Sequence, residues 1–335
     1  MKKILTISIA AYNVEKYIDE TLKSLVCKNI NKLEVLIIDD GSKDNTSSIA
    51  KNYEKEYPNT FKVINKKNGG YGSTINKGIE LATGKYFKQL DGDDKYDTTN
   101  LDILLEELSK TDADIIYTPY YSWNGQIMNP VYCGIEKNNT DIDDLNYYLK
   151  GFSNDIVMHS LAYKTTILKE NGIKILENSF YTDSEYALYP FMYAKTIKVF
   201  DLPLYVYRVG NIGQSVSIVG MRKHYEDFGK VINSILRNTN KISKNPKTYI
   251  EKYILYKIDN IFCISISNLI LALPYSYKNY KYIKNLDQHI KEENELLYID
   301  SKKHKTVHYF RKGKFLTYTL LHMFLKIRLK FKRGE

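Results

Sequence analysis

The sequence contains few cysteines, and its first 221 residues contain a single arginine, Arg208, against 24 lysines. The three cysteines are odd in number, scattered and without a CxxC spacing, so we expect neither a disulfide framework nor a cysteine metal site, and a reducing compartment fits. No run of about 18 apolar residues is present, so nothing clearly spans a bilayer. The opening stretch ILTISIAAY is too short for a secretory signal, and we expect none.

A net positive charge is missing from the first two thirds of the chain. Residues 1–215 hold 25 basic and 29 acidic side chains, whereas residues 216–335 hold 24 and 10. The last 35 residues carry 11 basic residues against Glu335 alone. This distribution excludes a uniformly basic nucleic-acid-binding protein and indicates an acidic front followed by a basic tail. With 43% hydrophobic residues the chain can bury a core, which excludes a disordered protein.

Short apolar runs alternate with helical patterns through the first 120 residues. Strands are predicted at 4–10, 33–38, 61–64, 85–90 and 114–118, and helices at 14–26, 44–56, 70–83 and 99–109. Such βαβ units predict an α/β fold with a mostly parallel sheet flanked by helices. Ligands of these sheets bind outside the carboxyl ends of the strands, which directs attention to the residues after positions 10, 38 and 90.

The pattern changes beyond residue 120. Residues 121–160 mix tyrosine, asparagine and glycine, which indicates irregular or antiparallel additions. A helix is predicted at 184–194, strands at 198–200 and 204–207, and helices again from about residue 220. We therefore expect two parts, an α/β domain over residues 1–217 and a helical C-terminal region over residues 218–335.

Each of the three strand ends carries a polar set, namely Ala10–Asn13, Asp39–Ser42 and Asp91–Asp94. Asp and Gly are common in turns and helix caps, which is the structural explanation for such sets. The functional explanation is a divalent cation between carboxylates and a substrate diphosphate, because Mg²⁺ and Mn²⁺ prefer a few carboxylates plus phosphate oxygens. Three sets at one sheet edge favour the functional explanation.

Three segments resemble those of family 2 glycosyltransferases in order and spacing: SIAAYNVEKYIDETLKSL, LEVLIIDDGSKDNT and NGGYGSTINKGIELATGKYFKQLDGDD. Members of that family are inverting enzymes of the GT-A fold. The resemblance covers residues 4–120, continues less closely to about 217, and does not reach the C-terminal helices. It implies that the nucleotide-sugar is bound by Ala10, Tyr12, Asp40, Asp91 and Arg208.

The resemblance also implies individual roles. Tyr12 would pack against the nucleotide base and Asp40 would accept an imide N–H from it, while Asp39 supports their loop. Asp91 would lie near the ribose or sugar. Asp93 would complete the DxD motif as a ligand of Mn²⁺ or Mg²⁺.

Two neighbouring positions need separate comment. Asp94 is expected to cap the element that follows it. Many relatives have Ala-Arg-Asn where this chain has Thr74-Ile75-Asn76, so the contact made by that arginine is unaccounted for. Lys77 points elsewhere on a helix and is not a replacement.

An inverting transfer needs a base that takes the proton of the incoming hydroxyl. The segment FYTDSEY, residues 180–186, opens a predicted helix and resembles the late acidic motif of the family. Asp183 is therefore the expected base, and Glu185 is the second choice. The structural alternative is a helix-capping acid stabilised by the helix dipole.

Arg208 belongs to the segment YVYR and precedes GQSVS at residues 213–217. The first 221 residues use lysine at almost every basic position. The single arginine therefore indicates that a planar donor, able to form two hydrogen bonds at once, is needed at residue 208. Similar elements in family members close over the diphosphate or the acceptor; the alternative is a structural ion pair. His159 lies where acceptor contacts are expected, although a core histidine is the simpler interpretation, and Trp123 offers a stacking surface for a sugar.

Residues 311–333, RKGKFLTYTLLHMFLKIRLKFKR, place basic residues around an apolar stretch. This segment is too short to span a bilayer and fits an interfacial helix on an anionic membrane. The expected apolar face comprises Leu320, Leu321, Phe324, Leu325 and Ile327. The alternative is a C-terminal helix packed on the core with a solvated basic end.

These features predict a metal-dependent glycosyltransferase on the inner face of the cytoplasmic membrane. The donor would be a UDP-sugar and the acceptor a saccharide, lipid-linked, in capsule or cell-surface polysaccharide synthesis; no nucleic-acid partner is expected. A sugar nucleotidyltransferase is an alternative, although its glycine-rich loop after the first strand is missing. A non-catalytic nucleotide-sugar-binding subunit is another, which the intact aspartates oppose and Ile75 allows. The absence of GxGxxG and GK[ST] excludes dinucleotide and P-loop chemistry.

Overall fold

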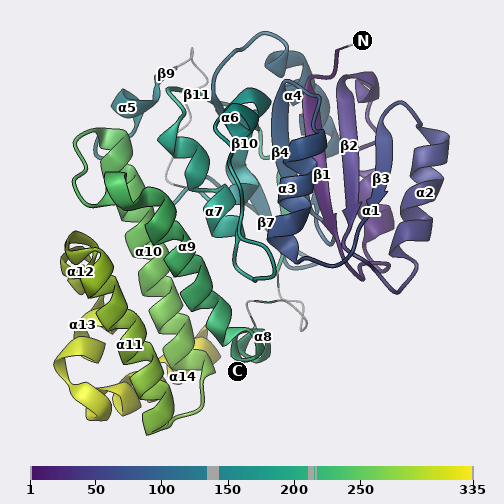
Figure 1. Cartoon of the computed structure of the whole chain (residues 1–335). Helices are drawn as coiled ribbons and strands as arrows, with labels where there is room; N and C mark the ends of the chain where they lie inside the picture. Colours follow the sequence, from purple (N-terminus) through teal and green to yellow (C-terminus); the bar gives the residue numbers. More distant parts are fainter. Residues whose placement is uncertain (1, 134–142, 210–214, 216, 334–335) are drawn as a thin grey trace. The chain divides into compact units, whose positions relative to one another are not determined.

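A computed structural model describes residues 2–133, 143–209, 215 and 217–333 of the chain. The chain divides into two compact units, residues 1–211 and residues 212–335. The first unit combines strands and helices, and the second consists of helices (Figure 1). The division expected from the sequence lies close by, between residues 217 and 218.

An eight-stranded sheet forms the centre of the first unit, in the order β3-β2-β1-β4-β10-β6-β11-β9. Its strands are β1 (Leu5–Ala11), β2 (Leu33–Asp39), β3 (Phe61–Asn65), β4 (Tyr86–Asp91), β6 (Ile115–Tyr117), β9 (Asp143–Asp144), β10 (Leu161–Lys164) and β11 (Thr196–Val199). β1 lies between β2 and β4 and is parallel to both, whereas β10 is antiparallel to its neighbours β4 and β6. β1 and β2 are apolar and buried nearly throughout, as strands covered on both faces must be. The predicted α/β fold with a mostly parallel sheet is confirmed.

A second sheet of four strands has the order β5-β12-β7-β8. Its members are β5 (Lys95–Tyr96), β7 (Tyr120–Trp123), β8 (Met128–Val131) and β12 (Tyr205–Arg208). β7 and β8 form an antiparallel pair, which confirms the antiparallel additions expected after residue 120. β12 pairs with β5, the strand directly after DGDD, so a late segment of the chain lies beside the acidic set.

The helices of the first unit are α1 (Ile18–Lys23), α2 (Thr46–Glu56), α3 (Tyr71–Leu81), α4 (Thr98–Leu108), α5 (Leu145–Tyr148), α6 (Thr165–Glu170) and α7 (Asp183–Tyr186). Short 3₁₀ turns are η1 (Ile30–Lys32), η2 (Met158–Ser160) and η3 (Tyr189–Met192). α3 and α6 pack against the same face of the sheet (Figure 1). The single helix predicted at 184–194 is wrong: α7 stops early and η3 follows, because Pro190 has no N–H to continue an α-helix.

The second unit contains α8 (Ile218–Lys223), α9 (Tyr225–Ser243), α10 (Tyr249–Ala272), α11 (Tyr277–Glu293), α12 (Glu295–Asp300), η4 (Ser301–Lys303), α13 (Lys305–Lys312) and α14 (Lys314–Arg333). A capping box formed by Thr248 and Glu251 starts α10. Among the described residues α10 alone has the length and composition to cross a membrane, yet 61% of its apolar window is buried within the structure. This helix therefore lies mostly within the described helical unit.

The α14 helix has two apolar faces. Tyr318, Leu321 and His322 are buried, and the His322 ring Nδ1 lies 2.6 Å from the carbonyl oxygen of Ile270 in α10. The opposite stripe is 52–74% exposed and comprises Leu316, Leu320, Met323, Phe324 and Ile327. Placing Leu321 on the exposed face was wrong, because helical periodicity turns it toward the bundle.

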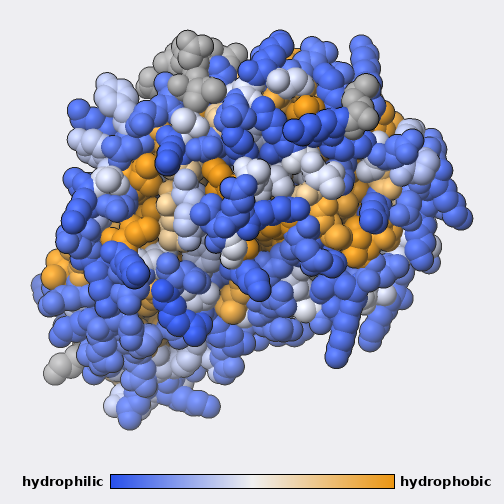
Figure 2. Space-filling view, turned by 45° about the horizontal axis from the view of Figure 1, so that its top comes forward, coloured by the Kyte–Doolittle hydropathy of each residue, from blue (hydrophilic) through white to orange (hydrophobic). Residues whose placement is uncertain are grey.

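The alternative expectation, a tail helix packed on the core, is thus realised on one side of α14, while the other side remains apolar and exposed. On the face drawn in Figure 2, hydrophilic residues cover most of the surface and hydrophobic residues show in separate patches. The exposed stripe of α14 is defined by the exposed fractions of its individual side chains.

Candidate active site

The ends of β1, β2 and β4 meet at one edge of the large sheet. Ala11 is in register with Asp39 on one side, and Ala10 is in register with Asp91 on the other. The Gly92 N–H donates to the Ala10 carbonyl oxygen over 3.0 Å, so the chain just after β4 stays alongside β1. The three polar sets found in the sequence are therefore neighbours in space, as expected.

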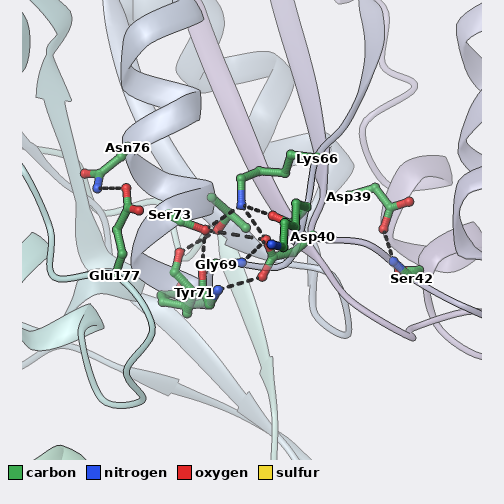
Figure 3. A network of polar contacts seen from close by, with 12 residues as sticks. Asp39, Asp40, Ser42, Lys66, Gly69, Tyr71, Ser73, Asn76 and Glu177 are labelled. Atoms are coloured by element: carbon green, nitrogen blue, oxygen red, sulfur yellow. Dashed lines mark hydrogen bonds and ion pairs between the residues drawn. The ribbon is translucent and has the colours of Figure 1, made fainter.

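Asp40 lies at the centre of a hydrogen-bonded loop (Figure 3). Its Oδ1 accepts from the Lys66 ammonium over 2.6 Å and from the Gly69 N–H over 3.0 Å, and its Oδ2 accepts from the Gly70 N–H over 2.8 Å. The Ser73 hydroxyl is 3.4 Å from Oδ1. With 3% exposure, the carboxylate is stabilised by one cation and two amides rather than by water.

Gly69 and Gly70 can approach Asp40 because they lack side chains. A Cβ on Gly69 would lie 2.8 Å from the Ser73 hydroxyl, and Gly70 has φ +80°, a value that other residues rarely adopt. Within the described part of the chain, Gly70 is the single donor to Asp40 Oδ2. A carboxylate oxygen accepts two hydrogen bonds, so Oδ2 can accept one more.

The neighbouring loop residues have the expected arrangement. Asp39 is buried and accepts the Ser42 N–H over 2.9 Å, so it supports the loop, as predicted. Tyr12 follows β1 and is 49% exposed, so its ring is accessible for packing. Its neighbour Asn13 has φ 53° and accepts the Lys43 N–H over 2.8 Å, which joins the β1 and β2 loops.

The acidic set after β4 is crowded and poorly hydrated. The Tyr71 hydroxyl donates to Asp91 Oδ1 over 2.6 Å. Burial and the nearby charge of Asp93 raise the pKa of Asp91 to about 7, although the Tyr71 hydrogen bond opposes this shift. Burial also raises the pKa of Asp93. Both carboxylates would gain stability from a bound cation.

Asp94 was expected to cap the next element, and this expectation is wrong. The N-cap of α4 is Asp97, which accepts the Asn100 N–H. Asp94 is buried and accepts from the Tyr205 hydroxyl and the Arg208 N–H, each over 2.7 Å. Burial, together with Asp91 and Asp93, raises the pKa of Asp94 to about 9.

The side chains in this region include carboxylates and an imidazole, which are groups that bind divalent metal ions. One ligand atom each of Asp91, Asp94 and His159 lies within 4.8 Å of the others, and Asp93 is next to them in sequence. Carboxylates whose pKa values are raised by burial and mutual repulsion are those that a divalent cation stabilises. The role of Asp93 as the principal ligand stays a prediction.

His159 is a largely packed residue, as the simpler interpretation has it. Its ring stacks on Tyr207 at 4.4 Å between centroids and meets Tyr205 edge-on at 4.7 Å. Burial, and then the nearby Lys88, lowers its pKa to about 3. Its Nδ1 is buried and has no hydrogen-bond partner among the described residues.

Arg208 is held by several partners next to the acidic set. Its Nε donates to the Asp93 carbonyl oxygen over 3.0 Å, and its Nη2 pairs with Glu20 over 2.7 Å. Its guanidinium also lies over the ring of Trp123 at 4.5 Å. The structural ion pair is thus present, and binding of a diphosphate by Arg208 stays a prediction.

Two further sequence-based expectations concern Trp123 and the segment at 213–217; the first needs revision, and most of the second lies outside the described residues. The Trp123 ring carries the cations of Arg208 and Lys95, at 4.5 and 4.1 Å from its centroid, so it positions basic side chains rather than offering an open sugar platform. Of the segment at 213–217, residues 213, 214 and 216 lie outside the described residues. Ser217 accepts the Gly220 N–H and caps α8.

Asp183 is exposed and begins α7. Thr182 occupies the N-cap position and no side chain caps the helix, so Asp183 is not an N-cap. Its charge acts on Asp91 and raises the pKa of that group, so the two carboxylates lie near each other. Glu185 is fully buried: its Oε2 accepts the Leu176 N–H over 2.6 Å and its Oε1 accepts the Tyr189 hydroxyl over 2.7 Å. Glu185 therefore holds the backbone, and Asp183 is the better candidate base.

The segment before Asp183 is tied to the Asp40 loop. The Asn178 N–H donates to the Gly69 carbonyl oxygen over 2.6 Å. Asn76 exchanges hydrogen bonds with the Ile175 peptide, over 2.8 Å in each direction, and donates to Glu177 over 2.9 Å. Ile75, at the position of the missing arginine, is fully buried.

The sequence did not identify four contributors to this site: Lys66, Tyr71, Asn178 and Tyr205. Tyr71 stands within the quoted segment NGGYGS, so the resemblance contained a signal for its region. Tyr205 meets Asp94 across 111 residues of sequence, and no local pattern shows such a contact.

Comparison with known proteins agrees with this geometry. Residues 6–170 match the family model Glycosyl transferase family 2. The chain is 28% identical to the uncharacterized glycosyltransferase EpsJ of Bacillus subtilis over 218 residues, which are 62% of either chain. It is 26% identical over 292 residues to the uncharacterized glycosyltransferase MG060 of Mycoplasma genitalium, covering 82% of this chain and 96% of that relative. The match to EpsJ thus spans about three fifths of that relative's length.

Solved structures show the same fold. S. aureus TarS, residues 1–349 in complex with UDP-GlcNAc, matches with a TM-score of 0.64 and 21% identity, over 99% of this chain and 92% of that one. The mannosyltransferase PcManGT of Pyrobaculum calidifontis, in complex with GDP-Man and Mn²⁺, matches with a TM-score of 0.51 and 13% identity, over 96% and 88%. By the match over residues 6–170, the first unit of this chain belongs to glycosyl transferase family 2, a family of enzymes.

Proposed function

We propose that the protein is an inverting glycosyltransferase that moves a sugar from a UDP-sugar to a saccharide acceptor, with Mn²⁺ or Mg²⁺ as cofactor. The catalytic domain would comprise residues 1–217. The carrying observation is that Asp40, Asp91 and Asp93 lie at or just after the ends of β2 and β4 at one sheet edge, while the exposed Asp183 at the start of α7 is close enough for its charge to raise the pKa of Asp91. The bound UDP-GlcNAc of TarS and the Mn²⁺ of PcManGT support the donor and the cofactor.

The nucleotide base would be recognised by Tyr12 and Asp40. The exposed ring of Tyr12 offers a packing surface, and Asp40 Oδ2 retains one acceptor position beside the Gly70 N–H. Uracil has an N–H at N3, whereas neutral cytosine has an acceptor there. A buried carboxylate without a partner is unfavourable, so this site should favour UDP over CDP.

The diphosphate would bind beside Asp91 and Asp93. A divalent cation bound by these carboxylates would offset the negative charge of the departing diphosphate. Tyr71 holds Asp91 in place, and Arg208 holds the Asp93 peptide through its carbonyl oxygen. Both contacts orient the carboxylates before the donor binds.

Asp183 would act as the general base. Its carboxylate takes the proton of the acceptor hydroxyl, whose oxygen bonds to the anomeric carbon as the bond from that carbon to the diphosphate oxygen breaks. Attack opposite the leaving group inverts the configuration. Exposure of Asp183 leaves room for an acceptor, and the link from Asn178 to Gly69 positions its segment next to the donor loop.

A lipid-linked acceptor at the inner membrane face, in capsule or cell-surface polysaccharide synthesis, completes the proposal. The exposed stripe of α14 supplies apolar area, and the basic tail supplies charge for an anionic surface. The apolar stripe and the basic tail together favour peripheral attachment of the protein to the membrane rather than a C-terminal helix that is free in water.

Mass spectrometry of UDP-sugar turnover tests the proposed function. With Mn²⁺, the wild-type protein should release UDP from one member of a UDP-sugar panel. Asp183→Asn should lower transfer by about 10²-fold or more while donor affinity stays nearly unchanged. Glu107→Gln, a change to a partly exposed carboxylate on α4 that pairs with Lys110, is the matched control and should have no effect. Failure of every UDP-sugar, or full activity of Asp183→Asn per folded molecule, would contradict the proposal.

A further inference from the structure

A second set of metal-ligating side chains lies in the helical unit, apart from the acidic site. Asp259 and Cys263 are four residues apart on α10 and so share one face of that helix. His304 stands between η4 and α13. One ligand atom of each residue lies within 4.8 Å of the other two.

The spacing of these atoms resembles the edges of a tetrahedron around zinc. Cys263 Sγ is 3.6 Å from Asp259 Oδ1, and His304 Nε2 is 3.1 Å from Asp259 Oδ2. With metal–ligand bonds of about 2.0–2.3 Å, tetrahedral geometry places neighbouring ligand atoms about 3.3–3.8 Å apart. The two distances above end on different oxygens of Asp259, but one ligand atom of each of the three residues lies within 4.8 Å of the other two, so rotation of these side chains would complete the three edges.

The surroundings favour a cation that can enter from one side. Asp259 and Cys263 are buried, whereas the His304 side chain is 37% exposed and leaves a path to solvent. Burial raises the pKa values of both Asp259 and Cys263, and the contact with His304 offsets this shift at Asp259 only in part, so the charged forms lack full compensation. A divalent cation would supply that compensation.

Arg311 fills this role only in part: its charge opposes the upward pKa shift of Cys263 without reversing it. The Arg311 guanidinium pairs with Asp287 over 2.6 Å and stacks on Tyr298 at 3.7 Å from the ring centroid. Its charge is thereby offset by a carboxylate other than Asp259. Asp300, which raises the pKa of Asp259, adds negative charge nearby.

We propose that Asp259, Cys263 and His304 bind a zinc-class transition-metal ion, with water as the fourth ligand on the exposed side. Sulfur, imidazole and carboxylate together suit Zn²⁺, whereas Mg²⁺ and Mn²⁺ favour oxygen ligands, so the site would differ in metal from the acidic site. On binding, the Cys263 S–H bond breaks, the proton passes to water and a sulfur–metal bond forms, with no oxidation or reduction. The ion would fasten α10 to the turn before α13. Cysteine spacing did not indicate this site because the histidine follows 41 residues after Cys263.

Cobalt titration of the full-length protein tests this proposal. Co²⁺ replaces zinc, and a sulfur-to-metal charge-transfer band appears only when a thiolate is bound. We expect the band at one equivalent, with release of about one proton per ion. Cys263→Ser should abolish the band, while Cys27→Ser, a change to the other buried cysteine, should retain it. A wild-type protein without the band, or a band that persists in Cys263→Ser, overturns the proposal.

A second variant covers the case in which Cys263→Ser does not fold. His304→Gln should keep the thiol but weaken Co²⁺ and Zn²⁺ binding by about tenfold or more; unchanged affinity overturns the proposal. Zn²⁺ should also raise the melting temperature of the wild type more than that of His304→Gln. Sugar transfer with Mg²⁺ should be the same in wild type and Cys263→Ser, so this test is independent of the proposed function.

Discussion

Removing one hydroxyl group, by Tyr71→Phe, tests how the acidic site is kept charged. That hydroxyl donates to Asp91 Oδ1 over 2.6 Å, and its second polar neighbour is the Met158 sulfur at 3.2 Å. A hydrogen bond to a charged group contributes about 1.5–3 kcal/mol. Phenylalanine keeps the ring and its packing, so the change removes mainly this hydrogen bond from the ionised form of Asp91.

The magnitude follows from linkage. Since about 1.4 kcal/mol corresponds to one pKa unit, the pKa of Asp91, already raised to about 7 by burial and by Asp93, should rise further by about one to two units in the variant. A protonated carboxyl does not bind a cation. Transfer at pH 7 should therefore fall by about 5- to 50-fold, and much of the loss should be recovered at pH 9.

The assay is the pH dependence of UDP-sugar turnover at a Mn²⁺ concentration well below saturation, where protonation of Asp91 and metal binding compete. The rising limb of the profile should move to higher pH in Tyr71→Phe. Tyr53→Phe is the matched control, because the Tyr53 hydroxyl donates to a surface carboxylate, Asp19, over 2.9 Å. A loss of rate that is equal at every pH would refute the reasoning, since it would show that Tyr71 acts through packing alone.

Three further predictions concern the donor, the metal and the tail. Asp93→Ala should lower transfer more than tenfold with saturating Mn²⁺ while the melting temperature is retained, because a lost stabiliser of the leaving group costs several kcal/mol; a variant that keeps more than about a tenth of the rate would contradict the metal assignment. Calorimetry should show tighter binding of UDP than of CDP, and equal affinities would count against recognition of the base by Asp40. Leu320→Ser with Phe324→Ser should weaken binding to anionic liposomes and leave UDP-sugar hydrolysis unchanged, because both side chains are exposed and point away from the bundle; Leu321→Ser is the control that should destabilise the fold instead.

Unfolding without metal offers a separate check on the acidic cluster. The pKa values of Asp91 and Asp94 are raised in the folded state, so their contribution to stability is fully present below the unfolded pKa of about 4. It should be lost as the pH rises through about 7 and about 9. Mn²⁺ should reverse this loss; a melting temperature that is independent of pH over this range, with and without Mn²⁺, would contradict the assigned environment.

The sequence predicted the sheet edge because its signals are local. Apolar runs such as LEVLIID end in aspartates, and adjacent parallel strands bring those ends together whatever the rest of the chain does. The role of Asp94 could not be read in this way. Its partners Tyr205 and Arg208 come 111 and 114 residues later, and only the pairing of β12 with β5 brings them near.

The two acidic residues near the start of α7 were likewise beyond local reasoning. Asp183 and Glu185 are both acids in the first turn, and the sequence ranked them on resemblance alone. Burial separates them: Glu185 is enclosed and bound to the Leu176 N–H, whereas Asp183 faces solvent. Which of two nearby acids is enclosed depends on the packing of the whole unit, so sequence spacing does not reveal it.

The peptide unit between Gly69 and Gly70 sets a distance within the protein. A trans peptide is flat and rigid, and its N–H and C=O point in opposite directions. Here the N–H faces Asp40 and the C=O faces the N–H of Asn178. A single rigid peptide unit thus separates Asp40, the carboxylate proposed to bind the nucleotide, from the segment that leads to Asp183, the proposed general base. Insertions on either side would tilt this peptide unit and displace both hydrogen bonds at once, so under the proposed function the spacing between the donor and acceptor sites depends on a rigid peptide bond rather than on flexible side chains.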